Sequence, residues 1–258
     1  MPIRLYKGIT YLTSDALEYH KVKHGFFMRH GGISPFPWKS LNMATSVGDS
    51  SENVIENRKR IADSLQISQF SFYDLWQVHS NEVVIAENPR PKGTPHIQAD
   101  AIVTNNFDVA LLMQFADCVP ILFYDPDRKV IASVHAGWKG TIDGIAFETI
   151  KVMMEKFKCK PKNIISVIGP SICQDHYQIG DDVAFQVKTV FDPEENFLTF
   201  KSEKIFLDLA AANKNILEKL GLRNIEMMEI CTFCNKEDWF THRGEDGKTG
   251  RFASVITL

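Results

Sequence analysis

The 258-residue chain has no long hydrophobic run and no marked excess of charge of one sign. No apolar stretch approaches the roughly 20 residues that span a bilayer, and residues 1–20 lack the apolar core of a signal peptide. With 29 basic against 32 acidic residues, the composition gives no electrostatic footprint for nucleic acid or for an anionic membrane. We therefore expect a cytoplasmic protein that binds neither nucleic acid nor membranes.

Cysteine is also scarce, and its five positions are too few and too scattered for a disulfide framework. In a reducing compartment each is a thiol that either fills the core or carries chemistry. Cys231 and Cys234 form a Cys-x-x-Cys pair, which is typical of half a structural zinc site or of a redox pair, but a second such pair is absent. His242 offers a third ligand for a small Cys/Cys/His site; against this alternative, we expect plain thiols at the end of a strand.

The 44 % hydrophobic content, with 15 Gly and 11 Pro, excludes a disordered or low-complexity chain. The mixture of expected elements indicates an α/β or α+β fold with one core over most of the chain. Strict alternation of strands and helices is absent, which excludes a Rossmann or barrel fold. Apolar periodicity predicts helices over residues 52–66, 141–157, 181–191 and 208–220. Apolar runs predict strands over residues 82–86, 101–104, 109–115, 119–124, 130–135, 164–168 and 225–230.

Three side chains that can bind a metal stand at the ends of apolar strands, next to polar or glycine-containing turns. They are His79 in QVHSN, Cys118 in ADCVP and His135 before AGWKG. One thiolate and two imidazoles suit Zn²⁺ and can also hold copper, and three ligands leave a position open for water. The alternative is a core cysteine and two hydrogen-bonded structural histidines, because the three residues form no local motif.

The chain has no GxxxxGK[ST] or GxGxxG phosphate-binding motif. Weaker anion-binding elements are Arg29 with the glycines of residues 31–32, the turn of residues 137–141 before a helix, and residues 169–172. Arg243 and Arg251 add two cations near the C-terminus. The alternative interpretation of each element, taken singly, is a turn whose charged side chain is exposed to solvent.

Ordered sequence blocks closely resemble the YfiH/YlmD-type laccase-domain family, from about residue 24 to residue 256. The blocks are HGFFMRHGGIS, SLNMATSVGD, ENRKRIADSL, QVHSN, ADCVPILFYDP, VHAGWKGT, IGPSI and THRGEDGKTGRFASVI. The resemblance implies one laccase-like domain over residues 1–258. It also implies a mixed-sheet, layered α-β-β-α sandwich, a fold compared with the catalytic domain of a bacterial cytotoxic necrotising factor.

The resemblance also implies an activity and a metal. The family's metal ligands fall on His79, Cys118 and His135, with zinc as the expected ion and copper as an alternative. Members were first called multicopper polyphenol oxidases and are now regarded as zinc-associated purine nucleoside phosphorylases. Their substrates are phosphate with adenosine, inosine, guanosine or methylthioadenosine, and adenosine deamination is a second activity. The expected partners of this chain are therefore purine nucleosides and phosphate.

Phosphorolysis of a glycosidic bond requires a positioned anion and a stabilised purine leaving group, and this requirement suggests further roles. We hypothesise that Arg29 is catalytic and helps to hold phosphate. Ser40, Asn42 and Gln77 are candidate contacts to ribose or base. Lys139, where the family often has Arg, is a candidate anion contact without bidentate geometry.

Two neighbours of the expected metal ligands have two interpretations each. Asp117, beside Cys118, either supports the metal or moves protons, or it stabilises a turn. Trp138 either stacks on the base or belongs to the core.

Two other classes of function remain open. A copper-dependent polyphenol oxidase needs several copper centres, whereas eight histidines without an HxH pair build one metal site. A non-catalytic protein that only binds nucleosides is the second alternative. Formation of hypoxanthine and ribose-1-phosphate from inosine and phosphate distinguishes all three.

Overall fold

A computed structural model describes residues 1–258. It contains two large sheets, and the first is built from strands near both ends of the chain and two strands from its middle. All neighbours in this sheet are antiparallel except β4 and β7, which are parallel. In spatial order its strands are β1 (Ile3–Tyr6), β2 (Ile9–Leu12), β3 (Lys23–Phe27), β15 (Phe252–Thr257), β7 (Ala110–Phe115) and β4 (Phe72–Tyr73).

The second sheet is antiparallel at its centre and parallel at both edges, where β14 joins β10 and β5 joins β6. Its central hairpin, formed by β8 (Val119–Asp125) and β9 (Val130–Ala136), is buried along its whole length. Both faces of that hairpin are therefore covered, as the unbroken apolar runs indicate. In spatial order its strands are β14 (Asn224–Met227), β10 (Ile165–Ile168), β8 (Val119–Asp125), β9 (Val130–Ala136), β6 (Ala101–Thr104) and β5 (Val83–Ile85).

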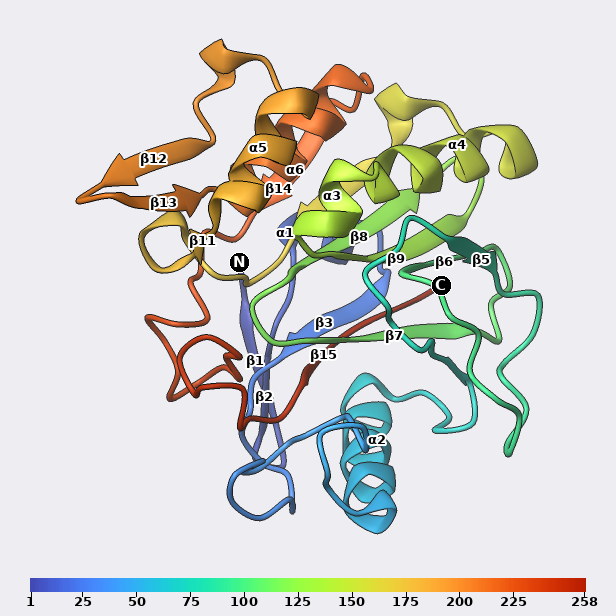
Figure 1. The fold of residues 1–258 in the computed structure, drawn as a ribbon. Helices are drawn as coiled ribbons and strands as arrows, with labels where there is room; N and C mark the ends of the chain where they lie inside the picture. The colour runs from blue at the N-terminus through green and yellow to red at the C-terminus, as the bar shows by residue number, and fades with distance from the viewer.

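Helices cover the outer faces of both sheets, which gives four layers in the order α-β-β-α (Figure 1). The helix α2 (Ser51–Leu65) covers the first sheet; Ser50 caps its start by accepting a hydrogen bond from the Asn53 amide. The second sheet is covered by α3 (Trp138–Ile142), α4 (Ile145–Phe157), α5 (Asp181–Val190) and α6 (Leu209–Lys219). Smaller elements are α1 (Asp15–Tyr19), β11 (Gln178–Ile179), β12 (Leu198–Lys201), β13 (Lys204–Leu207) and the 3₁₀ turns η1 (Pro161–Asn163), η2 (Gln174–His176) and η3 (Pro193–Glu195).

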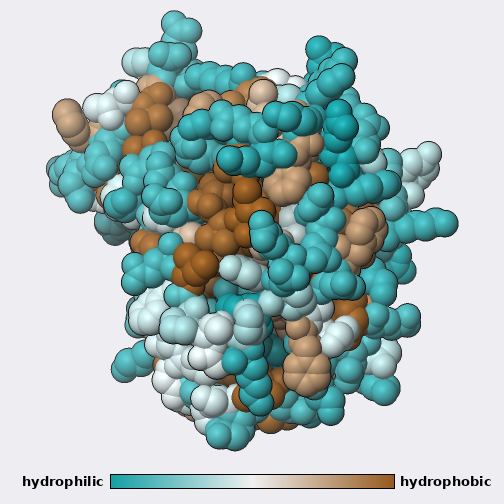
Figure 2. All heavy atoms as spheres, turned by 90° about the vertical axis from the view of Figure 1, so that its right-hand side faces the viewer, coloured by the Kyte–Doolittle hydropathy of each residue, from teal (hydrophilic) through white to brown (hydrophobic).

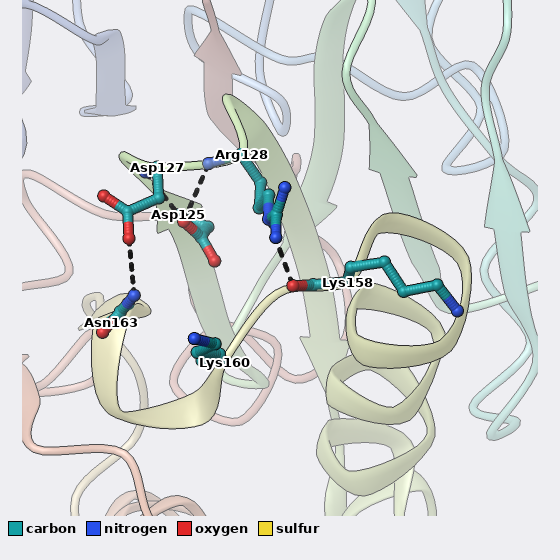
Figure 3. Close-up of a pocket in the computed structure, with 6 residues that line it drawn as sticks. All are labelled: Asp125, Asp127, Arg128, Lys158, Lys160 and Asn163. Carbon is teal, nitrogen blue, oxygen red and sulfur yellow. Dashed lines mark hydrogen bonds between the residues drawn. The ribbon is translucent and has the colours of Figure 1, made fainter.

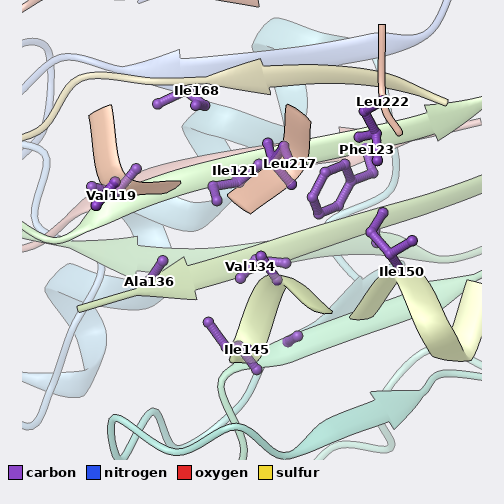
Figure 4. Packing of buried hydrophobic residues seen from close by; sticks show 14 of the residues in the cluster. Val119, Ile121, Phe123, Val134, Ala136, Ile145, Ile150, Ile168, Leu217 and Leu222 are labelled. Atoms are coloured by element: carbon purple, nitrogen blue, oxygen red, sulfur yellow. The ribbon is translucent and has the colours of Figure 1, made fainter. Parts of the chain in front are cut away.

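The alternation of side chains along a strand sorts the apolar residues into three cores. Ile121 and Phe123 of β8 pack against the helices over the second sheet (Figure 4), whereas Leu122 and Tyr124 face the first sheet. The third core lies between the first sheet and α2. Each fully buried Leu, Ile or Phe contributes about 1.5–3 kcal/mol to folding. Burial in the three cores therefore stabilises the packing of the sheets on each other and on the helices.

The layered α+β fold is confirmed, and the expected elements agree with the structure except at one helix and at the strand expected over residues 225–230, which ends at Met227. The helix expected over residues 141–157 is two helices, because Gly144 adopts a positive φ of 81° between α3 and α4. The strands of the first sheet other than β7 were not expected, and neither were α1 and the small sheet β11–β13–β12.

The turn between β8 and β9 lies at the far end of the hairpin from Cys118 and His135. There the Asp125 carboxylate accepts hydrogen bonds from the Asp127 and Arg128 amides, and Asn163 donates to Asp127 at 2.7 Å (Figure 3). These contacts surround a polar hollow of about 120 Å³ and fasten the turn to η1. The hollow contains no histidine or cysteine, and we assign it a structural role.

Figure 2 views the side of the molecule that carries β5, the edge strand of the second sheet, and the C-terminus. Hydrophobic residues gather near the middle of this side within a mostly hydrophilic surface. Apolar surface of this kind is ordinary for a folded chain. No helix combines the length and the hydropathy needed to cross a membrane.

Candidate functional site

The structure brings the side chains of His79, Cys118 and His135 together, with all three donor atoms within 4.8 Å of one another. His79 lies in the loop between β4 and β5, Cys118 directly precedes β8, and His135 lies in β9. Pro120 of β8 pairs with His135, which places Cys118 beside the end of β9. The antiparallel hairpin therefore unites two donors, and the preceding loop adds the third.

The backbone around these donors includes two residues with positive φ and one glycine that has no room for a side chain. His79 and Asp117 have positive φ angles of 60° and 81°, which are uncommon for residues with a side chain. A Cβ atom on Gly137 would lie 2.7 Å from Cδ2 of His79 and 3.2 Å from the Cys118 sulfur. Glycine at this position therefore leaves the room in which the donors meet.

Asp100 orients both histidines. One carboxylate oxygen lies 2.8 Å from Nδ1 of His135, which leaves Nε2 of that ring for a ligand. The other oxygen accepts hydrogen bonds from the Val78 amide and from the amide and hydroxyl of Ser80, on either side of His79. Burial by itself raises the pKa of Asp100, but the His135 contact and the Ser80 donors outweigh it and lower that pKa to about 2.

Cys118 and His135 shift each other's pKa toward a charged pair. Burial opposes charge on both groups, yet the neighbouring rings of His135 and His79 lower the pKa of the Cys118 thiol. The thiolate of Cys118 and the Asp100 carboxylate in turn raise the pKa of His135 against the effect of burial. Without a metal, a Cys118 thiolate beside a protonated His135 ring is therefore the favoured state, and a metal would take the place of the proton between them.

This donor set fits a zinc ion. Tetrahedral Zn²⁺ with bond lengths of about 2.3 Å to sulfur and 2.05 Å to nitrogen separates those two ligand atoms by about 3.6 Å. The Cys118 sulfur and Nε2 of His79 are 3.8 Å apart. One thiolate and two imidazoles also match the ligand preferences of zinc, and copper accepts the same donors.

The three donors line a cavity of about 660 Å³, a size typical of small-molecule sites. Cationic, aromatic and amide side chains share its wall. These are Arg58, Arg243 and Arg251, Trp76, Trp138 and Tyr177, and Gln77 and Gln114. The cavity thus joins a candidate metal centre to groups that bind an anion and to flat rings that a base can stack on.

Arg243 and Arg251 retain guanidinium groups available to a ligand. Each uses only its Nη1 atom in hydrogen bonds to the protein, Arg243 to the Gln178 carbonyl and Arg251 to the Thr249 and Gly250 carbonyls. Asp117 holds the backbone of Arg243, because its carboxylate accepts from the Arg243 amide and from the Thr232 hydroxyl, each at 2.7 Å. Both carboxylate oxygens of Asp117 thus already have partners in the chain.

Of the residues expected to contact substrate, Gln77 lines the cavity and the other four do not. Arg29 donates to the Lys39, Lys236 and Trp239 carbonyls and pairs with Glu245 at 3.0 Å. Ser40 bonds the backbone of Arg29 and Gly32, and Asn42, fully buried, accepts from the Arg251 amide. Lys139 pairs with Asp143 at 2.7 Å on the exposed face of α3.

Several other residues that the sequence analysis left open, or did not single out, also line the cavity. Trp138 lies in the cavity wall, as does His242, which is therefore no partner of Cys231 and Cys234. Trp76 and Tyr177 also line the cavity, but no sequence motif indicates a role for either residue. Arg243 and Arg251 were noted as cations, but the sequence does not indicate that they meet the metal ligands across the fold.

Fold and site together define a class: an α-β-β-α layered protein with a cavity built around an open Cys/His metal-binding group. The chain belongs to the family described as multi-copper polyphenol oxidoreductase laccase, whose model matches residues 23–258. The resemblance to YfiH- and YlmD-type proteins is thereby confirmed.

Named relatives cover nearly the whole chain. A protein of Deinococcus radiodurans named purine nucleoside phosphorylase is 35 % identical over 237 residues, which are 92 % of this chain and 89 % of the relative. Purine nucleoside phosphorylase YlmD of Bacillus subtilis is 35 % identical over 243 residues, or 91 % and 87 % of the two chains. The crystal structure of the hypothetical protein YfiH of Bacillus licheniformis matches with a TM-score of 0.91 at 33 % identity, covering 100 % of this chain and 99 % of that one.

Proposed function

We propose that this protein is a zinc-associated purine nucleoside phosphorylase. It cleaves adenosine, inosine, guanosine or methylthioadenosine with phosphate to the free base and ribose-1-phosphate or methylthioribose-1-phosphate. Adenosine deamination is its second activity. The observation that carries the proposal is one cavity in which three metal donors face free guanidinium groups and aromatic rings. The names of its relatives support the same activity.

In this proposal His79, Cys118 and His135 hold the zinc ion. Bound zinc supplies a Lewis acid at the cavity wall. Asp100 fixes the protonation of His135 and the loop that carries His79, so the two imidazole nitrogens stay directed at the ion. Because the two neighbouring rings lower the pKa of Cys118, its thiolate supplies the negative charge that a borderline-soft dication favours.

Arg243 and Arg251 are the groups that we assign to phosphate. Guanidinium groups bind phosphate oxygens in bidentate, charge-assisted pairs, and both side chains have unused donors in the cavity. Holding the anionic nucleophile beside the sugar removes much of the entropic cost of bringing two molecules together.

The aromatic and amide side chains of the cavity are assigned to the nucleoside. Trp76, 61 % exposed in its wall, and Trp138 offer faces for stacking. Gln77 is held rigidly, since its side-chain amide bonds both the amide and the carbonyl of Gln114. Burial raises the pKa of Tyr177, so its phenol stays protonated and can donate a hydrogen bond to the departing base.

Arg29, Ser40 and Asn42 act in this proposal by positioning rather than by touching substrate. Arg29 ties down the Glu245 side chain and the Trp239 carbonyl, and Asn42 holds the Arg251 amide. They thereby fix the loop from which His242, Arg243 and Arg251 enter the cavity. Residues 1–258 act as a single domain in this proposal. A reducing cytoplasm keeps the five cysteines free of disulfides, so that they can bind a metal.

The test is turnover of inosine by the purified chain. We expect hypoxanthine and ribose-1-phosphate in equal amounts, only with phosphate present, and loss of both activity and one zinc ion in the Cys118→Ala variant. Cys159→Ala is the matched control, because Cys159 is buried in the core just after α4 and is no member of the donor group of Cys118.

Three results would contradict the proposal. Undiminished phosphorolysis by Cys118→Ala would remove the metal from the reaction. Oxygen uptake with a phenol, and no response to phosphate, would indicate an oxidase. Retention of inosine without product would indicate a protein that only binds nucleosides.

A further inference from the structure

A second group of metal-binding side chains lies outside the cavity. It consists of Cys173, His176, Cys231 and Cys234, whose four donor atoms all lie within 4.8 Å of one another. Cys173 and His176 belong to the segment between β10 and β11, and Cys231 and Cys234 to the turn that follows β14. The sequence led us to expect plain thiols at a strand end, whereas the structure places Cys231 and Cys234 beside a third cysteine and a histidine.

Backbone pairing brings the two segments together just before the donors. Ser171 bridges Cys231 in a parallel arrangement: its amide donates to the Ile230 carbonyl, and its carbonyl accepts from the Thr232 amide, each at 3.1 Å. Each segment then contributes one donor pair at a spacing of three residues, Cys-x-x-His from the first and Cys-x-x-Cys from the second. Such paired spacings are typical of structural zinc sites.

The distances match tetrahedral coordination. Nδ1 of His176 lies 3.3 Å from the Cys173 sulfur and 3.5 Å from the Cys234 sulfur. Ligand atoms of tetrahedral zinc are separated by about 3.6 Å for sulfur and nitrogen, from the bond lengths usual for this ion. Three sulfurs and one nitrogen complete the coordination shell, so this group differs from the open site of His79, Cys118 and His135.

Neighbouring groups hold the donors in this arrangement. The amides of Cys173 and Cys234 both point at the Cys231 sulfur, at 3.3 and 3.4 Å. Two N–H donors on one sulfur stabilise the thiolate that a metal requires. The His176 ring stacks on Phe233, with centroids 4.1 Å apart and planes 16° apart, so Nδ1 faces the sulfurs.

We propose that Cys173, His176, Cys231 and Cys234 bind a second Zn²⁺ ion in a closed, structural site. Its four ligands leave no position for substrate, so the site fastens the segment after β10 to the turn after β14. Tyr177 follows His176 directly and lines the cavity, and Arg243 bonds the Gln178 carbonyl. The second ion thus holds one wall of the cavity without taking part in the chemistry.

The test is a count of metal by elemental analysis on protein purified under reducing conditions with zinc. We expect two zinc ions per chain in the wild type and in the Cys159→Ala control, and one in Cys173→Ser and Cys234→Ser. Cys118→Ala should also hold one ion, which is the ion bound by Cys173, His176, Cys231 and Cys234. The double variant Cys118→Ala/Cys234→Ser should hold none. This count does not depend on nucleoside turnover, so it separates failure of this inference from failure of the proposed function.

A spectroscopic readout covers the case in which Cys173→Ser or Cys234→Ser does not fold. Metal-free Cys118→Ala protein is titrated with Co²⁺ alone; we expect one equivalent to produce intense thiolate-to-cobalt absorption with the visible bands of tetrahedral Co²⁺. The exchange His176→Ala should weaken Co²⁺ binding at least tenfold and alter the visible bands. The inference would be overturned by a single zinc ion in the wild type that Cys234→Ser retains, by no such absorption in Cys118→Ala, or by a disulfide among these cysteines in freshly purified, alkylated protein.

Discussion

Nδ1 of His135 lies 2.8 Å from the Asp100 carboxylate, and both side chains are buried. The backbones of the same two residues are also joined, because the His135 amide donates to the Asp100 carbonyl at 2.8 Å. The second carboxylate oxygen holds the loop on both sides of His79. One aspartate outside the donor set therefore determines how both histidines approach a metal.

The exchange Asp100→Asn should lower zinc affinity at this site about 10–100-fold, the usual effect of losing a partner behind a metal ligand. The amide keeps the size of the side chain but turns an N–H group toward the donors of either His135 or Ser80. Competition with a chromophoric chelator measures the change. Asp143→Asn, which removes only the exposed pair with Lys139, is the control. Equal affinities in both variants would exclude Asp100 from this role.

Arg251→Gln should raise the KM for phosphate at least tenfold, with a smaller effect on the KM for inosine. The guanidinium has unused donors in the cavity, and loss of a charge-assisted bond to an anion costs about 1.5–3 kcal/mol. Steady-state kinetics with each substrate varied in turn measures the split. Lys139→Gln tests the rival anion contact, and Lys151→Gln, which lies in an exposed pair with Glu148, is the neutral control. A larger effect of Lys139→Gln than of Arg251→Gln would reverse the assignment.

Asp74→Asn should destabilise the fold by about 3–5 kcal/mol at pH 7, the usual cost of breaking a buried ion pair. Asp74 is 2 % exposed and contacts Arg58 and Arg90, each at 2.7 Å, and His96 at 3.1 Å. Burial by itself raises the pKa of Asp74, but the charge of Arg58 and the contacts of His96 and Arg90 hold that pKa well below its usual range.

The sign of the pH dependence follows from that lowered pKa. The unfolded chain takes up the Asp74 proton near pH 3.9, before the folded chain does. The stabilisation is therefore complete above about pH 5 and declines as the pH falls. Urea unfolding at several pH values should show the wild type and Asp74→Asn converging below about pH 4. A difference that stays constant down to pH 2.5, or one no larger than that of the exposed-pair control Glu148→Gln, would contradict this account.

The sequence predicted the helices and the second sheet for an identifiable physical reason. Amphipathic periodicity marks α2, α5 and α6, and strands buried on both faces read as unbroken apolar runs, as in β8 and β9. The short strands β1 and β4 carry no such signal, because two to four residues cannot establish a period. Within residues 141–157 the apolar pattern continues across Gly144, so periodicity alone does not reveal the break between α3 and α4.

Site residues were predictable where chemistry and strand ends coincide, as at His79, Cys118 and His135. Contacts that depend on tertiary folding were not: Arg29, with a glycine pair beside it, is typical of an anion site, yet the fold directs its guanidinium to Glu245. The second metal-binding group did carry a signal. Cys173 and His176 have the same spacing as Cys231 and Cys234, but a search for paired cysteines alone does not detect a cysteine paired with a histidine.

The place of β15 in the first sheet has a consequence for biosynthesis. Residues 252–257 lie between β3 and β7 and hydrogen-bond to both. Until that stretch is synthesised, β3 and β7 have no common partner, and the backbone hydrogen bonds along their facing edges are unmade. Folding of this layer is thus postponed until the nascent chain has delivered β15, and Arg251, directly before it, reaches the cavity in the same late event.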